Sequence, residues 1–189
     1  MDCRIGSVSF CAHNHTYSYN GKSLKGITSC VSKSLHKVYP DTPLVKTASA
    51  FGIDVHGEVE RYYNEGNTVL STEAGTFVVK ALEDFAEDKG VFDYSIRCEV
   101  MVSDFETTAS KIDVVMETPY GAFLFDIKTT QNFDREYCSR QLSVYQYLYV
   151  KNYERTVLGL YVIATVPKRI FHILYRGDDM AKKLLEMNR

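Results

Sequence analysis

Short apolar runs in the second half of the chain predict five β-strands. Three runs come in succession and two more follow a helical segment; they are 98–102, 111–118, 121–129, 156–166 and 168–176. Between the second and third runs, Thr118-Pro119-Tyr120-Gly121 is a turn signal, so these two strands should be neighbours. The run 156–166 is apolar almost throughout, which predicts an interior strand buried on both faces.

Helical spacing accounts for most of the remaining chain. Apolar and aromatic residues recur every four positions from Phe51 to Tyr63, which predicts a helix over 49–65. A short helix capped by Thr28 or Ser29 should end near Tyr39, before a proline. Further helices are predicted over 72–89, 135–152 and 177–189. The last of these has two acids in its first turn, where the helix dipole favours negative charge.

An N-terminal β-hairpin is predicted around Asn20-Gly21, a pair that supplies the two positive φ angles of a type I′ turn. The whole order is then hairpin, helices, three strands, helix, two strands and helix. This order favours an α/β (α+β) fold with a central mixed sheet flanked by helices. We expect a single domain over 1–189: hairpin and helices in 1–90, the sheet core in 91–175 and the C-terminal helix in 177–189.

Composition excludes several classes of protein. The 189 residues are 45% hydrophobic, a balance that argues against a disordered or collagen-like chain. No apolar run approaches the roughly 18 residues that a membrane helix needs, and the first residues lack the basic and apolar pattern of a signal peptide. The five cysteines are scattered, which favours reduced thiols over a zinc or iron–sulfur site. We therefore expect a cytoplasmic protein with no membrane partner.

Charge is distributed unevenly along the chain. Residues 1–50 carry a net charge of +4, residues 51–106 carry −9 and residues 107–189 carry +3. Basic surface around an acidic centre would suit a polyanionic ligand. Ordinary solvated charge explains the same numbers equally well, so charge alone does not identify a partner.

The strongest chemical candidates lie on the second and third predicted strands. Asp126 and Lys128 are two positions apart and should point to one face of their strand. Asp113, on the neighbouring strand, can approach that face. Two carboxylates and the Ile127 carbonyl would be oxygen ligands suited to Mg²⁺ or Mn²⁺. A buried Asp–Lys salt bridge beside an unrelated aspartate is the alternative.

Four sequence features resemble motifs of the PD-(D/E)XK nuclease superfamily, in its RecB-like and phage-type exonuclease branch, and they occur along the chain in the order expected for that branch. The strand segments around Asp113 and around Asp126-Ile127-Lys128 resemble its second and third motifs. Gly52 to Glu60, with His56 between them, resembles the upstream GxxxHxxxE helix, and Gln141 to Tyr145 resembles the QxxxY motif. The hairpin also looks like that of phage-type members, so the resemblance spans about 15–150. It implies a restriction-endonuclease-like core.

The resemblance also implies roles for individual residues. Asp113, Asp126 and Lys128 would be catalytic, with Gln141 and Tyr145 in support; Tyr145 could instead belong to an aromatic core. His56 would join Asp113, Asp126 and the Ile127 carbonyl as a metal ligand. Supporting candidates are two acids, Glu60 and Glu99. Arg135 and Arg140 would be phosphate contacts or ordinary surface residues.

Departures from the family pattern limit the expectation. Ser110 stands where a glycine is usual, and the C-terminal cysteine cluster of the iron–sulfur members is missing. No nucleotide-binding GxxxxGK[ST] motif is present, so any unwinding of DNA would come from a helicase or recombination partner. The sequence leaves open the oligomeric state, the polarity of cleavage and the preference for single- or double-stranded ends.

The expected function is thus Mg²⁺- or Mn²⁺-dependent hydrolysis of DNA, with no iron–sulfur cluster and no nucleotide cofactor. An exonuclease in recombination, repair or phage DNA processing fits the resemblance best. Two alternatives stay open: a catalytically silent module that binds DNA or protein, and a metal enzyme acting on another substrate. The place of action would be the cytoplasm of a bacterium or of a phage-infected host.

Overall fold

A five-stranded mixed sheet organises the molecule. The computed structural model describes residues 2–37, 40–66 and 69–189. The sheet consists of β4 (Ser95–Ser103), β5 (Ala109–Thr118), β6 (Gly121–Lys128), β7 (Val157–Ala164) and β8 (Arg169–Ile173). Its strand order is β4-β5-β6-β7-β8, in which β6 and β7 run parallel and the other pairs run antiparallel. The mixed sheet and the interior position of β7 confirm the predictions from the apolar runs.

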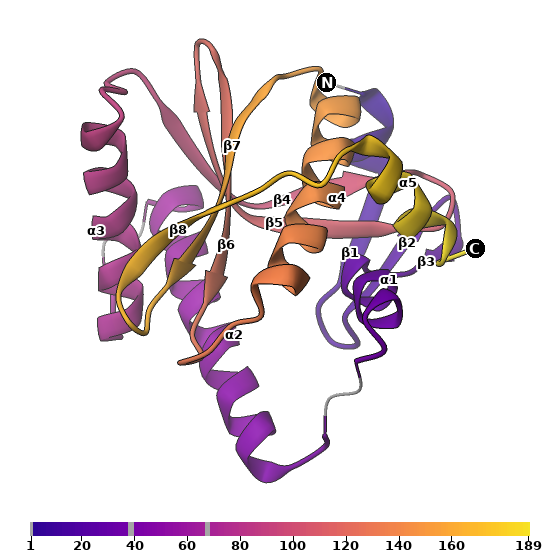
Figure 1. The fold of residues 1–189 in the computed structure, drawn as a ribbon, viewed down its shortest axis with the longest axis horizontal. Helices are drawn as coiled ribbons and strands as arrows, with labels where there is room; N and C mark the ends of the chain where they lie inside the picture. The colour runs from indigo at the N-terminus through magenta and orange to yellow at the C-terminus, as the bar shows by residue number, and fades with distance from the viewer. Residues whose placement is uncertain (1, 38–39, 67–68) are drawn as a thin grey trace.

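Helices cover both faces of this sheet (Figure 1). They are α1 (Ile27–Ser34), α2 (Pro43–Asn64), α3 (Glu73–Asp88), α4 (Arg135–Tyr153) and α5 (Asp178–Glu186). α1, α4 and α5 pack with one face of the sheet, and α2 and α3 pack with the other. The protein is therefore an α+β fold. Within the described ranges, no helix combines the length and apolar character needed to cross a membrane.

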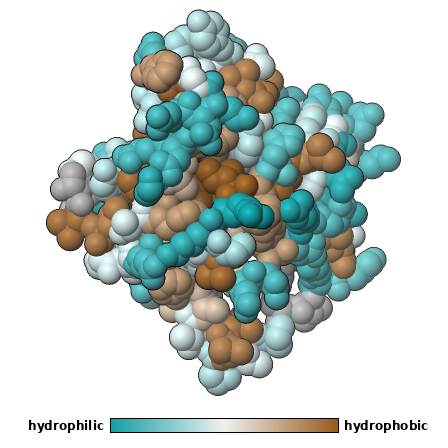
Figure 2. Space-filling view, turned by 60° about the vertical axis from the view of Figure 1, so that its left-hand side comes forward, coloured by the Kyte–Doolittle hydropathy of each residue, from teal (hydrophilic) through white to brown (hydrophobic). Residues whose placement is uncertain are grey.

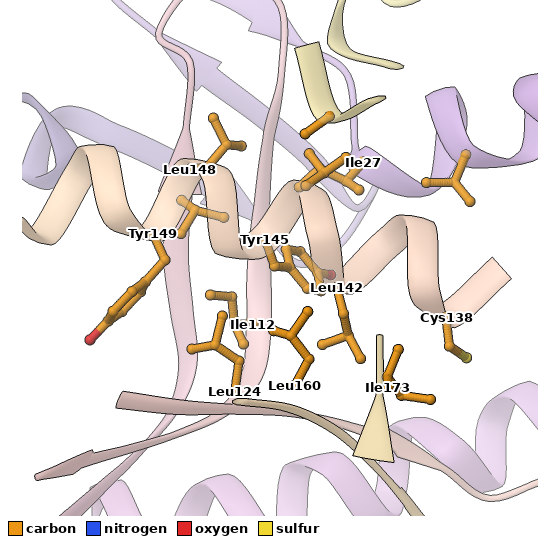
Figure 3. Close-up of a cluster of buried hydrophobic side chains, with 14 of the residues drawn as sticks. Ile27, Ile112, Leu124, Cys138, Leu142, Tyr145, Leu148, Tyr149, Leu160 and Ile173 are labelled. Atoms are coloured by element: carbon orange, nitrogen blue, oxygen red, sulfur yellow. The ribbon is translucent and has the colours of Figure 1, made fainter. Parts of the chain in front are cut away.

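The core beneath α4 is built from large aliphatic and aromatic side chains (Figure 3). Leu142 and Tyr149 of α4 point toward the side on which Ile112 and Leu124 of the sheet lie, and Leu148 belongs to the same buried cluster. Each of these five side chains is essentially inaccessible to solvent. Burial of a large apolar side chain contributes roughly 1.5–3 kcal/mol, so this layer fixes the positions of β5 and β6, which carry the candidate site.

An aromatic cluster fills the other layer. Phe85 of α3 lies edge-on to Phe123, Phe125 and Tyr161, at ring-centroid distances of 5.3, 5.0 and 4.8 Å. Edge-to-face contacts of this kind are favoured by the ring quadrupoles. They anchor α3 to β6 and β7.

A second, three-stranded antiparallel sheet is formed near the N-terminus. It contains β1 (Val8–Cys11), β2 (Thr16–Tyr19) and β3 (Lys22–Leu24), after a 3₁₀ turn at Cys3–Ser7. The β2–β3 hairpin confirms the prediction, because Asn20 and Gly21 have φ angles of 49° and 76°. β1 was not predicted from the sequence.

Several element boundaries differ from the sequence prediction. α1 starts after Gly26, not after Thr28 or Ser29, and ends at Ser34; the expected end at Tyr39 falls outside the described residues. α2 starts six residues earlier than predicted, because Thr42 caps it and Pro43 occupies its first turn. β8 ends at Ile173, so the strand predicted to run to residue 176 is shorter.

Glu58 connects α2 to the start of α3. Its buried carboxylate accepts hydrogen bonds from the Ser71 N–H (3.0 Å), the Thr72 N–H (3.2 Å) and the Thr72 hydroxyl (2.6 Å). Burial alone would raise the pKa of Glu58, but these donors hold it below its ordinary value. The contact fixes the second half of α2 against α3, and with it the position of His56.

Candidate active site

The site begins where β5 and β6 separate. Backbone pairing between them runs from Thr118 opposite Gly121 to Val114 opposite Phe125. Beyond that point the Ile127 N–H donates to Asp113 Oδ2 at 2.7 Å. The Asp113 carboxylate therefore takes a hydrogen bond in a place where the strands have stopped pairing, and it is held at the opening between them.

Glu99 faces this opening from β4, the edge strand. The register pairs Cys98 with Val114 and Val100 with Ile112, so Glu99 stands opposite Asp113. Glu99 has a φ of 55°, in the left-handed region that non-glycine residues seldom adopt. Like charges opposite one another on a sheet are destabilising, and strained backbone of this kind gathers at functional sites.

His56 reaches the same place from α2. Its Nδ1 lies 3.7 Å from Asp113 Oδ1, and its Nε2 lies 3.3 Å from the Ile127 carbonyl oxygen. With the proton on Nε2, the imidazole donates to that carbonyl, and Nδ1 keeps its lone pair toward the carboxylate. This tautomer leaves a neutral nitrogen ligand beside Asp113.

These three side chains form a group that could hold a metal ion. One ligand atom from each of His56, Glu99 and Asp113 lies within 4.8 Å of the other two. Burial raises the pKa of Asp113, as does the nearby charge of Asp126; burial and the charge of Asp113 raise the pKa of Glu99. The two carboxylates repel each other, and a divalent cation bound by them and by the imidazole nitrogen would compensate their negative charge.

Asp126 and Lys128 project together beside this group, as the two-residue period of a strand predicts. Lys128 Nζ lies 3.0 Å from Asp126 Oδ1 and 2.8 Å from Oδ2. Burial alone would lower the pKa of Lys128, but the charge of Asp126 raises it above its ordinary value. Lys128 is therefore a fixed ammonium at neutral pH.

The three-residue group differs from the ligand set expected from the sequence. Glu99, expected only as a supporting acid, belongs to it, whereas the buried Asp126 carboxylate is engaged by Lys128. The Ile127 carbonyl oxygen accepts the hydrogen bond from His56, and its second lone pair is available to bind a metal ion. Asp126 thus lies next to the group and influences Asp113 through its charge.

Gln141 and Tyr145 contact each other on α4. The Gln141 side-chain amide donates to the Tyr145 hydroxyl at 3.3 Å, and the same hydroxyl lies 3.3 Å from Ser110 Oγ on β5. Gln141 Oε1 is buried without a hydrogen-bond partner among the described residues. Tyr145 also belongs to the apolar core (Figure 3). The pair therefore connects α4 to the strand that carries Asp113.

The two arginines expected to contact phosphate are held elsewhere. Arg140 pairs with Glu136 at 2.8 Å and donates to the Ser34 carbonyl at 3.2 Å. The Arg135 guanidinium lies over the Phe171 ring, 4.9 Å from its centroid. Neither lines the cleft described next, whereas Glu60 does, one helical turn beyond His56.

A cleft of about 760 Å³ leads to His56 and Glu99. Residues from five parts of the chain line it: the segment from Phe10 to His15, α2 from Val45 to Glu60, Glu99 on β4, Lys111 on β5, and the end of β6 with the two residues after it. Lys111 Nζ lies 3.4 Å from Glu99 Oε2 and 4.3 Å from the centroid of the Phe10 ring. Sequence analysis missed Phe10, His15 and Lys111, although the two-residue period of β5 places Lys111 on the same face as Asp113.

Comparisons with known proteins leave the family open. The chain matches no protein-family model and no curated protein. Among solved structures, the crystal structure of SSO0001 aligns over 86% of this chain and 84% of its own, with 15% sequence identity and a TM-score of 0.31. A likeness of this size carries no argument about fold or function.

Proposed function

We propose that this chain is a divalent-metal-dependent nuclease that hydrolyses phosphodiester bonds in DNA, with a restriction-endonuclease-like core of the PD-(D/E)XK type. The observation that carries the proposal is the convergence of His56, Glu99 and Asp113 within 4.8 Å, at the end of β6 that bears the Asp126–Lys128 ion pair. It acts on DNA ends in recombination, repair or phage DNA processing, in the cytoplasm and with any unwinding supplied by a helicase partner.

The donor set matches the ion that such a reaction uses. Carboxylate oxygens and one imidazole suit Mg²⁺ or Mn²⁺, and the paired acids have raised pKa values that a cation would lower again. An ion held there supplies activation of water and neutralises charge on the phosphate. Two of the three side chains, His56 and Glu99, line the cleft together with Lys128.

The protein's own groups would divide the remaining work. Lys128 presents a permanent positive charge next to the ligands, where it can stabilise the charge that develops on a phosphate oxygen. The buried Asp126 holds that ammonium in one position. The Ile127 N–H orients the Asp113 carboxylate, and Tyr145 and Ser110 support the strand behind it.

The direct test is digestion of end-labelled linear DNA and of closed circles with Mg²⁺ or Mn²⁺, and again with EDTA. We expect metal-dependent loss of linear DNA, which Asp126→Ala abolishes, while circles persist because the cleft receives a strand end. Cutting in EDTA, or undiminished cutting by Asp126→Ala, would contradict the proposal. DNA binding without cutting under either metal would identify a silent binding module instead.

A further inference from the structure

One wall of the cleft is an uncharged face of α2. The face that carries His56 continues toward the start of the helix at three- and four-residue spacings. Its members line the cleft: Val45, Ala48, Ser49, Gly52 and Ile53. Three of the five side chains, those of Ala48, Ser49 and Gly52, are small, and a methyl group added at Gly52 would lie 3.3 Å from Thr129 Oγ1. The wall therefore leads directly to the end of β6.

This part of α2 projects from the body of the molecule (Figure 1). Residues 43–51 are all exposed, and Ile53 keeps 69% of its surface accessible. Figure 2 shows hydrophobic atoms at the lower end of the molecule, the end at which α2 projects in Figure 1. An apolar surface continuous with a charged centre suits a ligand that has one apolar part and one ionic part.

The opposite wall is aromatic. His15 follows β1, is exposed, and has a φ of 51°. Its ring packs edge-on against Phe10, with centroids 5.1 Å apart and an interplanar angle of 89°; Phe10 in turn rests on Tyr17 at 4.9 Å. The Phe10 ring therefore supports His15 from behind and leaves the imidazole accessible from the cleft.

Positive charge is confined to the inner end of the cleft. Two lysines line it, Lys111 and Lys128, and each lies next to a carboxylate, of Glu99 and of Asp126. No arginine is among the described residues that line it. Proteins that bind duplex DNA through its backbone use many unpaired cations, whereas single strands bind through base stacking on aromatic side chains.

We propose that this cleft binds the unpaired end of a single DNA strand. Bases would lie between the His15–Phe10 wall and the apolar face of α2, and the phosphate would point to Lys111, Lys128 and the metal ligands. A space of 760 Å³ is within the range that holds one drug-sized molecule, so it accepts about one or two nucleotides but not both strands of a duplex. This inference rests on the proposed function and adds its substrate.

The test measures binding of a fluorescent oligothymidylate by anisotropy, with Ca²⁺ present and intact oligonucleotide verified on a gel. Against wild type, we expect abasic sites at the strand end to weaken binding by about 5- to 150-fold. His15→Asn, which tolerates the positive φ, and Phe10→Leu should weaken binding of the normal strand to a similar extent. His13→Asn, an exposed histidine of the same turn that does not line the cleft, is the matched control and should bind as wild type does.

Salt dependence and duplex competition separate the alternatives. Two lysines predict that log affinity falls with log salt with a slope of about −1.4, and a blunt duplex should compete poorly. The inference is overturned if abasic ends bind equally well, if the slope is steeper than about −4, if blunt duplex binds more tightly, or if wild type binds no oligonucleotide. Digestion with Mn²⁺ is measured separately. Cleavage of duplex ends would contradict this inference but would still support the proposal that the protein is a nuclease.

Discussion

Replacing Lys128 by methionine is expected to lower the rate of DNA hydrolysis by about 100- to 1,000-fold, the range found when one group that stabilises transition-state charge is removed. The ammonium lies within 3.0 Å of the Asp126 carboxylate, next to the proposed metal ligands. The other lysine that lines the cleft, Lys111, lies beside Glu99 and is not placed to replace it. Single-turnover cleavage of a labelled oligonucleotide measures the effect.

The variant must be distinguished from one that merely folds badly. Lys128→Met leaves the buried Asp126 charge without its partner, a loss that can cost about 3–5 kcal/mol. The double variant Asp126→Asn/Lys128→Met removes both charges and should recover most of that stability without recovering cleavage. Lys168→Met, at an exposed ion pair with Glu73, is the control. Wild-type rates in a folded Lys128→Met protein would show that the lysine has no chemical role.

Mn²⁺ should stabilise the folded protein strongly, and Asp113→Asn should abolish the effect. At about 100 times its dissociation constant, a ligand of the folded state adds about 2.7 kcal/mol, which for a chain of this size corresponds to a rise in Tm of roughly 5–10 °C. The three ligands lie within 4.8 Å of one another. Differential scanning calorimetry with Mn²⁺ and with EDTA measures the shift.

Without metal the same substitution should raise stability. Burial and the nearby charge of Asp126 raise the pKa of Asp113, and burial and the charge of Asp113 raise the pKa of Glu99. A carboxyl whose pKa is higher in the folded chain destabilises the fold once ionised, and the penalty is relieved as pH falls through the folded pKa. The Asp113→Asn protein should thus be more stable than metal-free wild type at pH 7, and the difference in stability should shrink as the pH is lowered through the folded-state pKa of Asp113.

Glu83→Gln, on the exposed face of α3, controls for a general loss of negative charge. A metal-free Asp113→Asn protein less stable than wild type at pH 7 would mean that the carboxylate is held by favourable contacts rather than kept for a ligand. An undiminished Mn²⁺ shift in the variant would place the ion somewhere else.

Local chemistry allowed the sequence to predict much of this architecture. The Asn20-Gly21 turn, the apolar run that became β7, and the alternation that brings Asp126 and Lys128 to one face depend on neighbouring residues only. The positions of the sheet strands followed from the same patterns. The early start of α2 was missed because its first two turns are exposed and lack a buried apolar face.

The site was harder to predict, because it is formed by contacts between segments that lie far apart in the sequence. The sequence placed Glu99 near the centre only by resemblance, since its position opposite Asp113 follows from the β4–β5 register and its positive φ. Glu58 and Glu60 are two residues apart on one helix, yet one is a buried anchor for α3 and the other lines the cleft. The four-residue spacing from His56 to Glu60 pointed to the site, whereas no pattern in the sequence predicted the role of Glu58, because that role is set by what packs against α2.

The central claim is that one divalent ion held by His56, Glu99 and Asp113 is required for DNA hydrolysis. Its most direct test titrates Mn²⁺ into the protein while free Mn²⁺ is followed by electron paramagnetic resonance and the cleavage rate is measured on the same samples. Occupancy and rate should rise together in wild type and should both be lost in Asp113→Asn. Full cleavage before the ion binds, or a bound ion with no cleavage of any DNA, would contradict the account.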